Sequence, residues 1–188
     1  VVYANGTPRH SGVLAVGGDH VTNDIAMGLK LSLNRAEQIK KENGRAVLDP
    51  TVNGDTIDLS SDLGFADQKI KPAHLQLIMH ARVEEIFQLI RQDLGEAGLL
   101  AELRGGIYLT GGGARMEAIA DLARDVLGCP AAVARDQSDS GLQDVLDRPE
   151  NHTAIGLVKY GARQPDLRKS PGFFGTILGK ARRKLARH

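Results

Sequence analysis

The sequence holds few aromatic residues and no tryptophan. Phenylalanine, tyrosine and tryptophan together make up 4% of its 188 residues. A hydrophobic core must therefore be built mainly from leucine, isoleucine, valine and alanine, and the length suffices for one domain of ordinary size. There is a single cysteine, Cys129, which excludes an internal disulfide framework and fits a reducing compartment.

The net charge is small, and long apolar runs are lacking. The formal net charge is +1, so we expect no nucleic-acid partner. No apolar run reaches the length of a membrane-spanning helix, and the sequence shows no signal peptide. The histidines are not spaced as metal ligands and no Ser/His/Asp or Cys/His arrangement stands out, so we predict neither a metal site nor a catalytic residue. Because the chain opens with Val1 inside an apolar run, we expect a further N-terminal part of the protein.

The first and last parts of the sequence have the pattern of an α/β layer. Asn5-Gly6 is a strong hairpin signal, and it predicts a strand at 1–4 joined to one at 12–16. We expect Asp19 to cap the helix that follows. The later part predicts strand, helix, strand and helix, at residues 106–110, 116–127, 131–134 and 151–160.

The middle of the sequence predicts a small α+β insertion. Asn34 to Glu37 has capping-box spacing at the start of a helix that Gly44 ends. Pro72 suits the first turn of a long helix that ends near Gly95 and carries an apolar stripe. Short strands are expected at 46–48, 55–59 and 68–71.

A glycine triplet lies between a predicted strand and a predicted helix in the stretch IYLTGGGARMEAI, residues 107–119. Gly111, Gly112 and Gly113 could present backbone N–H groups and a helix N-terminus at the edge where α/β folds bind ligands. A backbone without side chains also lets a flat ring lie against it. The alternative is an ordinary tight turn. The stretch is neither GxGxxG nor a Walker A loop, so those nucleotide-binding families are not supported.

Two further features could bind a ligand. Glu37 and Lys40 lie three residues apart and share one face of the predicted helix. A carboxylate accepts from ribose hydroxyls and an ammonium group donates, so the pair could bind a ribose, although a solvated ion pair beside a capping box explains the same spacing. Gly17 and Gly18 end the second predicted strand, where a turn before a helix cap is the simpler interpretation.

Residues 172–188 combine bulky apolar and basic side chains after a proline-containing linker. In a helix, one arc of about 140° would hold the apolar residues Phe173, Phe174, Ile177, Leu178 and Leu185, with Lys180 and Arg183 opposite or beside it. This pattern is typical of a helix that lies in the plane of an anionic membrane surface. The alternative is a helix that docks on its own domain or on a partner, and the linker argues against the first of these.

Taken together, these stretches resemble one family. The segments are GVLAVGGDHVTNDIAMGL, AEQIKKENG, IYLTGGGARMEAIADLARDVLG and NHTAIGLVKYGA, followed by the basic tail. In order and spacing they are similar to the second half of the bacterial actin-like cell-division proteins of the FtsA family, over nearly the whole chain. The resemblance implies an α/β fold, one lobe of an actin-like (ribonuclease H-like) ATPase with a small α+β insertion subdomain. It implies subdomain 2A at 1–33 and 100–161, subdomain 2B at 34–99, a linker at 162–171 and an amphipathic membrane-targeting helix at 172–188.

The resemblance also implies a nucleotide site. It assigns the adenosine motif to Gly111, Gly112 and Gly113, adenosine contacts to Glu37 and Lys40, and the turn after the second phosphate hairpin to Gly17 and Gly18. The implied cofactor is ATP, with Mg²⁺ in the full-length protein. The phosphate loops would lie outside this chain, so we expect weak or no ATP binding by these 188 residues alone.

Partners and function follow from the same resemblance. It implies that the C-terminal peptide of FtsZ contacts the 2B helix at Arg82 and Glu85, that the protein self-associates into filaments, and that the tail binds an anionic membrane surface. The function would be to anchor FtsZ filaments to the cytoplasmic face of the inner membrane at the division septum and to help assemble the divisome. ATP would act as an assembly switch, with at most weak ATPase activity. Two alternatives stay open: a catalytic ATPase or kinase of the actin and Hsp70 superfamily, and a PilM-type pilus assembly protein.

Overall fold

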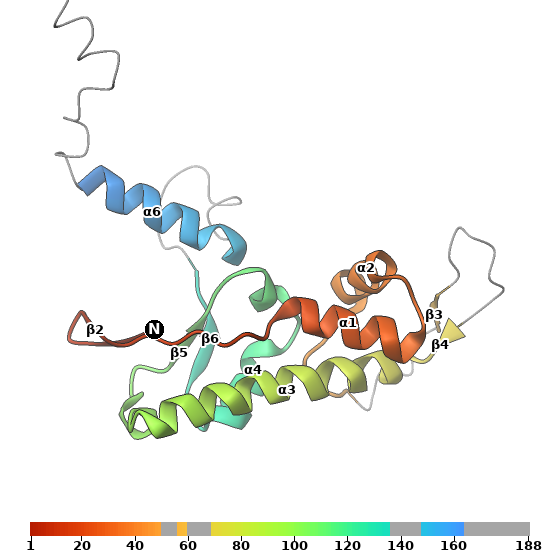
Figure 1. Ribbon diagram of the computed structural model, residues 1–188, viewed down its shortest axis with the longest axis horizontal. Coiled ribbons are helices and arrows are strands. Elements are labelled where there is room, and N and C mark those ends of the chain that lie inside the picture. The colour runs from red at the N-terminus through yellow and green to blue at the C-terminus, as the bar shows by residue number, and fades with distance from the viewer. Residues whose placement is uncertain (50–55, 60–68, 136–147, 164–188) are drawn as a thin grey trace, which may run out of the picture.

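A long helix, α3 (Pro72–Glu96), forms the spine of the molecule (Figure 1). The computed structural model describes residues 1–49, 56–59, 69–135 and 148–163. Helices α1 (Gly18–Leu29) and α4 (Ile119–Leu127) both pack against α3, and α2 (Leu33–Asn43) packs against α1. The proline at the first helical position and the helix end just beyond Gly95 confirm the bounds expected for α3.

One hydrophobic core joins these four helices. Buried side chains recur at every fourth residue along α3, which is the spacing of a helix face that packs against neighbours. The largest fully buried side chains come from α1, α2 and α3, and they are Val21, Ile25, Ile39, Leu75 and Met79. Burial of each such side chain stabilises the fold by about 1.5–3 kcal/mol relative to leaving it exposed to water. Because α3 supplies the stripe that the other helices cover, their relative positions depend on it.

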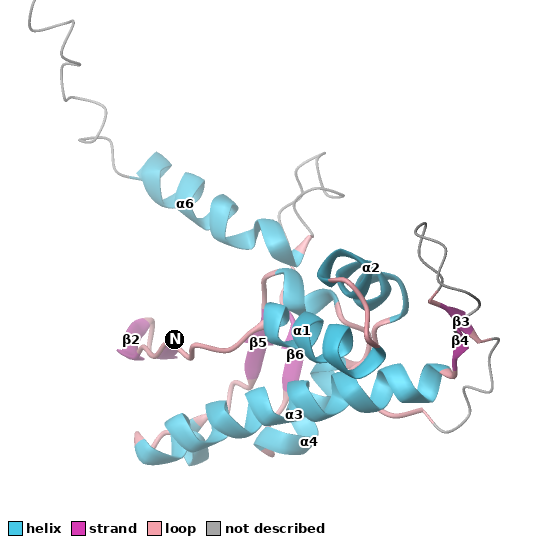
Figure 2. Ribbon diagram, turned by 45° about the vertical axis from the view of Figure 1, so that its right-hand side comes forward, coloured by secondary structure: helices cyan, strands magenta, loops and turns pink. Residues whose placement is uncertain are grey.

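The strands form three two-stranded sheets among the described residues. One is the antiparallel hairpin of β1 (Val2–Ala4) and β2 (Thr7–His10), and another joins β3 (Ile57–Asp58) to β4 (Lys69–Ile70). The third pairs β5 (Ile107–Leu109) with β6 (Ala131–Val133) in parallel, as Figure 2 shows. A parallel pair needs a crossover connection, and here it contains the 3₁₀ helix η2 (Gly112–Arg115) and α4.

The remaining elements lie around this framework. A short 3₁₀ helix, η1 (Leu100–Glu102), follows α3. Another, η3 (Pro149–Asn151), leads directly into α6 (His152–Arg163), the last described helix. The strands expected at 106–110 and 131–134 and the helix expected at 151–160 are therefore confirmed to within a few residues.

The N-terminal hairpin corrects one prediction. Its turn is at Asn5-Gly6 as expected, but the second strand is β2 and not residues 12–16. A two-residue turn pairs the residues that flank it directly, here Ala4 with Thr7. No described strand pairs with residues 12–16, and Val13 in that segment is 95% exposed.

Three further local predictions are wrong. Residues 46–48 form no strand, because the chain there makes only a single bridge, between Arg45 and Glu117. Helix α1 is capped by Gly17, so Asp19 lies in its first turn. Helix α2 begins at Leu33 because the hydroxyl of Ser32 accepts from the Arg35 N–H at 3.3 Å, which makes Ser32 the cap in place of a box opened by Asn34.

Gly44 ends α2 at its contact with α3, and no larger residue fits there. An added Cβ would lie 2.1 Å from the carbonyl oxygen of Lys40 and 2.7 Å from Cε of Met79. We expect Gly44→Ala to lower the free energy of unfolding by about 1–3 kcal/mol, because backbone must shift to remove the clash. Urea unfolding followed by circular dichroism measures the change.

Gly95→Ala is the matched control. Gly95 lies in the last turn of α3, and no atom lies within 4 Å of its added Cβ. Alanine has the higher helix propensity, so this substitution should be neutral or stabilising by up to about 1 kcal/mol. Equal stability of the two variants would contradict the packing assigned to Gly44.

Candidate functional site

The start of α1 and one face of α2 meet at a cluster of polar groups. Gly17 caps α1 and Gly18 is its first residue. The ammonium group of Lys40, on α2, donates to the carbonyl oxygen of Gly18 at 3.0 Å. The structure therefore brings together Gly18 and Lys40, which the sequence analysis identified separately.

Glu37 completes this cluster. Its Oε2 lies 2.5 Å from Nζ of Lys40, and its Oε1 lies 3.1 Å from Nζ of Lys41. The buried hydroxyl of Thr22, one turn after Gly18 in α1, donates to Oε2 at 2.5 Å and lies 2.7 Å from Nζ of Lys40. Thr22 is a functional residue that was not predicted from the sequence, although its position four residues after Gly18 places it on the same helix face.

This environment keeps Glu37 charged. Partial burial acts against the charged form, but hydrogen bonds from Lys40, Thr22 and Lys41 outweigh it and lower the pKa of the Glu37 carboxyl from 4.5 to about 2. Since the folded-state pKa is the lower one, the carboxylate stabilises the fold above about pH 4.5 and loses that contribution as the pH falls towards 2. At neutral pH the cluster offers a carboxylate acceptor and an ammonium donor, which together suit a ligand that carries hydroxyl groups.

The glycine triplet follows β5 and is not the start of an α-helix. The expected helix at 116–127 begins only at Ile119, after the four-residue 3₁₀ helix η2 and a break at Ala118, whose φ is 57°. In Figures 1 and 2 the turn after β5 lies beside the first residues of α1. An α-helix N-terminus therefore does not lie directly behind the triplet, which corrects the corresponding expectation.

The three glycines differ in what the backbone demands of them. Gly111 has φ 88°, a left-handed conformation that side chains rarely adopt. Gly112 and Gly113 lie outside that range, and an added Cβ at either would meet no atom within 4 Å. A tight turn accounts for Gly111 alone, and the open backbone of the other two leaves room for a flat group to lie against it.

The turn is fixed from its other side by the segment that begins α6. The N–H of Gly111 and the hydroxyl of Thr110 both donate to the carbonyl oxygen of Pro149, at 2.9 and 3.0 Å. Nδ1 of His152 lies 3.0 Å from the Thr110 hydroxyl oxygen. The ion pair of Arg115 with Glu150, at 2.9 Å, adds a second contact between η2 and η3. These contacts join residues about 40 positions apart, so no local sequence signal could have indicated them.

A second connection links the end of α2 to the segment that follows the glycine triplet. Arg45, just beyond α2, forms an ion pair with Glu117, just beyond η2. The N–H of Ala46 donates to the carbonyl oxygen of Glu117 at 2.8 Å. The end of the helix that carries Glu37 and Lys40 is thereby linked to the segment that follows the glycine triplet.

Arg82 and Glu85, expected to bind a partner, are engaged within the chain. The guanidinium group of Arg82 on α3 makes a two-point contact with Asp24 on α1, at 2.5 and 3.0 Å, and also pairs with Glu85. The hydrogen bond to Asp24 raises the pKa of Arg82. The structure thus gives Arg82 a role in fastening α1 to α3, which the sequence did not indicate.

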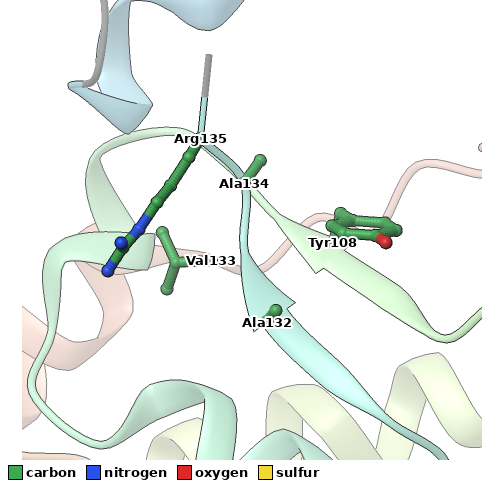
Figure 3. A pocket seen from close by; sticks show the side chains of 5 residues that line it. All are labelled: Tyr108, Ala132, Val133, Ala134 and Arg135. Atoms are coloured by element: carbon green, nitrogen blue, oxygen red, sulfur yellow. The ribbon is translucent and has the colours of Figure 1, made fainter. Parts of the chain in front are cut away.

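A hollow of about 480 Å³ lies where β5 and β6 end (Figure 3). Its lining residues are Tyr108, Ala132, Val133, Ala134 and Arg135. Tyr108 and Arg135 point to opposite sides of β6, so they do not converge on one point. None of the predicted site residues lines this hollow.

The remaining expectations concern the tail, metal sites and membrane-spanning helices. The predicted linker and the predicted membrane residues, from Phe173 to Leu185, lie outside the described residues. Within the described ranges, no group of three His, Cys, Asp or Glu side chains could hold a metal ion. In the same ranges, no helix combines the length and apolar character needed to cross a bilayer.

Comparison with solved structures identifies the fold. MreB5 of Spiroplasma citri bound to ADP superimposes with a TM-score of 0.63 at 19% identity, over 84% of this chain and 48% of that one. The same protein bound to AMPPNP gives a TM-score of 0.54 at 20% identity, over 79% and 47%. The chain therefore has the actin-like α/β fold that the sequence predicts.

Comparison with sequences identifies the family. The model of the family described as cell division protein FtsA matches residues 1–156. The cell division protein FtsA of Pseudomonas aeruginosa is 32% identical over 180 residues, which are 96% of this chain and 42% of the relative. The proteins of the same name from Bacillus subtilis and Escherichia coli are 32% and 29% identical, over 86% and 85% of this chain and 36% and 40% of their own length. The chain spans about two fifths of the length of these relatives, and it belongs to the FtsA family of cell division proteins.

Proposed function

We propose that this chain forms the adenosine-binding side of an ATP site in a protein that anchors FtsZ filaments to the inner membrane at the division septum and helps assemble the divisome. In this proposal subdomain 2A comprises residues 1–33 and 100–161, and subdomain 2B comprises 34–99. The observation that carries it is the Glu37–Lys40 pair, which is bonded to Gly18 at the start of α1. The two MreB5 structures are bound to ADP and AMPPNP, which supports a nucleotide site in a protein of this fold.

The residues present fit an adenosine group. Glu37 is a charged acceptor suited to ribose hydroxyls, and Lys40 is a donor suited to a ribose oxygen or a ring nitrogen. The open backbone of Gly112 and Gly113 suits the flat adenine ring. When bound, ATP with Mg²⁺ supplies the phosphate charge, and nucleotide occupancy acts as a switch for self-association into filaments.

The glycine triplet provides a test that separates binding from folding. Gly112→Ala and Gly113→Ala place a methyl group where the adenine would lie, without a clash inside the chain. In the full-length protein we expect each to weaken ATP binding by about tenfold or more, equivalent to about 1.4 kcal/mol. The melting temperature should not change. Calorimetric titration and thermal unfolding measure the two quantities.

Gly111→Ala is the control for this experiment. Gly111 has φ 88° and ψ 174°, a backbone conformation that is essentially restricted to glycine, so a side chain there costs about 1–3 kcal/mol and this variant should lower the melting temperature. Unchanged ATP affinity in the Gly112 and Gly113 variants would refute the proposal that adenine lies against this backbone. The triplet would then be an ordinary turn.

The proposed FtsZ contact at Arg82 and Glu85 must take account of Asp24. A peptide carboxylate that binds Arg82 competes with the two-point contact to Asp24. The simple substitution Arg82→Glu would therefore affect both the partner contact and the attachment of α1 to α3. A second variant is needed to separate the two effects.

Asp24→Asn provides that separation, because it weakens the internal ion pair and leaves Arg82 more available. We expect Arg82→Glu to weaken binding of an FtsZ C-terminal peptide by about tenfold, the range of a close charge pair. Asp24→Asn should preserve or strengthen the same binding. Fluorescence anisotropy with a labelled peptide measures both, and equal weakening by the two variants would assign Arg82 a structural role only.

The proposed membrane contact rests on the sequence of the tail. Full-length protein should float with vesicles that contain anionic lipid, whereas protein without residues 172–188 should stay in the dense fraction. Lys180→Glu combined with Arg183→Glu should lose most of the binding, since each basic residue near an anionic surface contributes about 1 kcal/mol. Neutral vesicles are the control, and equal flotation of the intact and shortened proteins would rule out the tail as the anchor.

A further inference from the structure

Thr22 occupies the centre of the cluster formed by α1 and α2. It is 7% exposed, and its hydroxyl oxygen lies 3.1 Å from the carbonyl oxygen of Gly18, 2.5 Å from Oε2 of Glu37 and 2.7 Å from Nζ of Lys40. Because the hydroxyl is buried, these three polar neighbours, and not solvent, determine its orientation.

The direction of each hydrogen bond follows from the chemistry of the groups. Lys40 can only donate, so the Thr22 oxygen accepts from it. The single hydroxyl hydrogen then has two candidate acceptors, and the charged carboxylate at 2.5 Å is favoured over the carbonyl at 3.1 Å. The Gly18 carbonyl already accepts from Lys40. Thr22 thus links the carboxylate to the ammonium group.

The two carboxylate oxygens of Glu37 have different partners. Oε2 is held by the buried hydroxyl of Thr22 and by Lys40, whose side chain is 13% exposed. Oε1 is held by Lys41, whose side chain is 71% exposed, at 3.1 Å. Exposed ion pairs of this kind are worth little. Oε1 is therefore the oxygen that a ligand can engage at small cost.

We propose that Thr22 is a positioning residue that fixes Glu37 so that its Oε1 accepts from a ribose hydroxyl and makes the site selective for ribonucleotides. This rests on the proposed function, in which Glu37 and Lys40 hold the ribose of ATP. Thr22 acts through Glu37 and does not itself contact the ligand. The Thr22 hydrogen bond is one of the causes that lower the pKa of the Glu37 carboxyl, so the carboxylate form of the side chain is stabilised by the same contact that orients it.

The test compares Thr22→Val with Thr22→Ser in the full-length protein. Valine keeps the branched shape and removes the hydroxyl, whereas serine keeps the hydroxyl and removes the methyl group. Dissociation constants are measured for ATP, 2′-deoxyATP and 3′-deoxyATP. We expect the parent protein to prefer ATP over at least one deoxy analogue, Thr22→Val to reduce that preference about tenfold, and Thr22→Ser to retain it.

A second readout does not depend on nucleotide. The pKa of the Glu37 carboxyl, followed by NMR, should rise in Thr22→Val from about 2 towards 4.5 and stay low in Thr22→Ser. Lys41→Ala provides a variant at an exposed position that leaves the buried cluster intact. It frees Oε1, so ATP affinity should be maintained or should increase.

Four outcomes would overturn the inference. They are an unchanged preference in Thr22→Val, an equal loss in the serine and valine variants, a fall in ATP affinity in Lys41→Ala, and equal binding of ATP and both deoxy analogues by the parent protein. A parent protein that binds no ATP at all would refute the proposed function itself. The NMR titration would still show whether Thr22 controls the Glu37 carboxyl.

Discussion

The buried stripe of α3 is the constraint on which the rest of the structure depends. Its side chains form one core with α1, α2 and α4, although these helices come from distant parts of the sequence. The contact is close enough at Gly44 that a methyl group would clash with Lys40 and Met79. Because α1 and α2 carry the polar cluster, and α4 lies on the crossover that follows the glycine triplet, the geometry of the candidate site depends on how these helices pack against α3.

The polar cluster is satisfied before any ligand arrives. Glu37, Lys40, Thr22 and Gly18 bond to one another in the described structure. A ligand that engages Glu37 and Lys40 therefore exchanges internal hydrogen bonds for new ones, and only the difference contributes to affinity. The same exchange applies to Arg82, because its contact with Asp24 must be weakened before it can bind a carboxylate of a partner. Preformed pairs of this kind favour selectivity over affinity, since a ligand that replaces them incompletely leaves a partly buried group unpaired.

The parts of this fold that could be predicted from the sequence are those that local chemistry determines. The turn at Asn5-Gly6, the start of α3 at Pro72 and the strand before the glycine triplet all carry their signals within a few residues. The strand expected at 12–16 failed because a strand needs a partner, and partners are a long-range property. Thr22, His152 and the Arg82–Asp24 pair were missed for the same reason, since each acquires its role from a residue on another element. Glu37 and Lys40 were found together because one helix face carries both.

The glycine triplet shows how one motif can serve two purposes. Gly111 is required by the chain itself, because its positive φ directs the backbone out of β5 and towards Pro149. Nothing inside the described chain requires glycine at the next two positions. The element that follows is a 3₁₀ helix of four residues, which lacks the aligned peptide dipoles of a longer α-helix that favour phosphate at an N-terminus. The open backbone at Gly112 and Gly113 also has room for a flat ring, which is the placement that we propose for the adenine. The two demands on the triplet are therefore separable, since the backbone conformation involves Gly111 and the proposed ligand contact involves the two glycines after it.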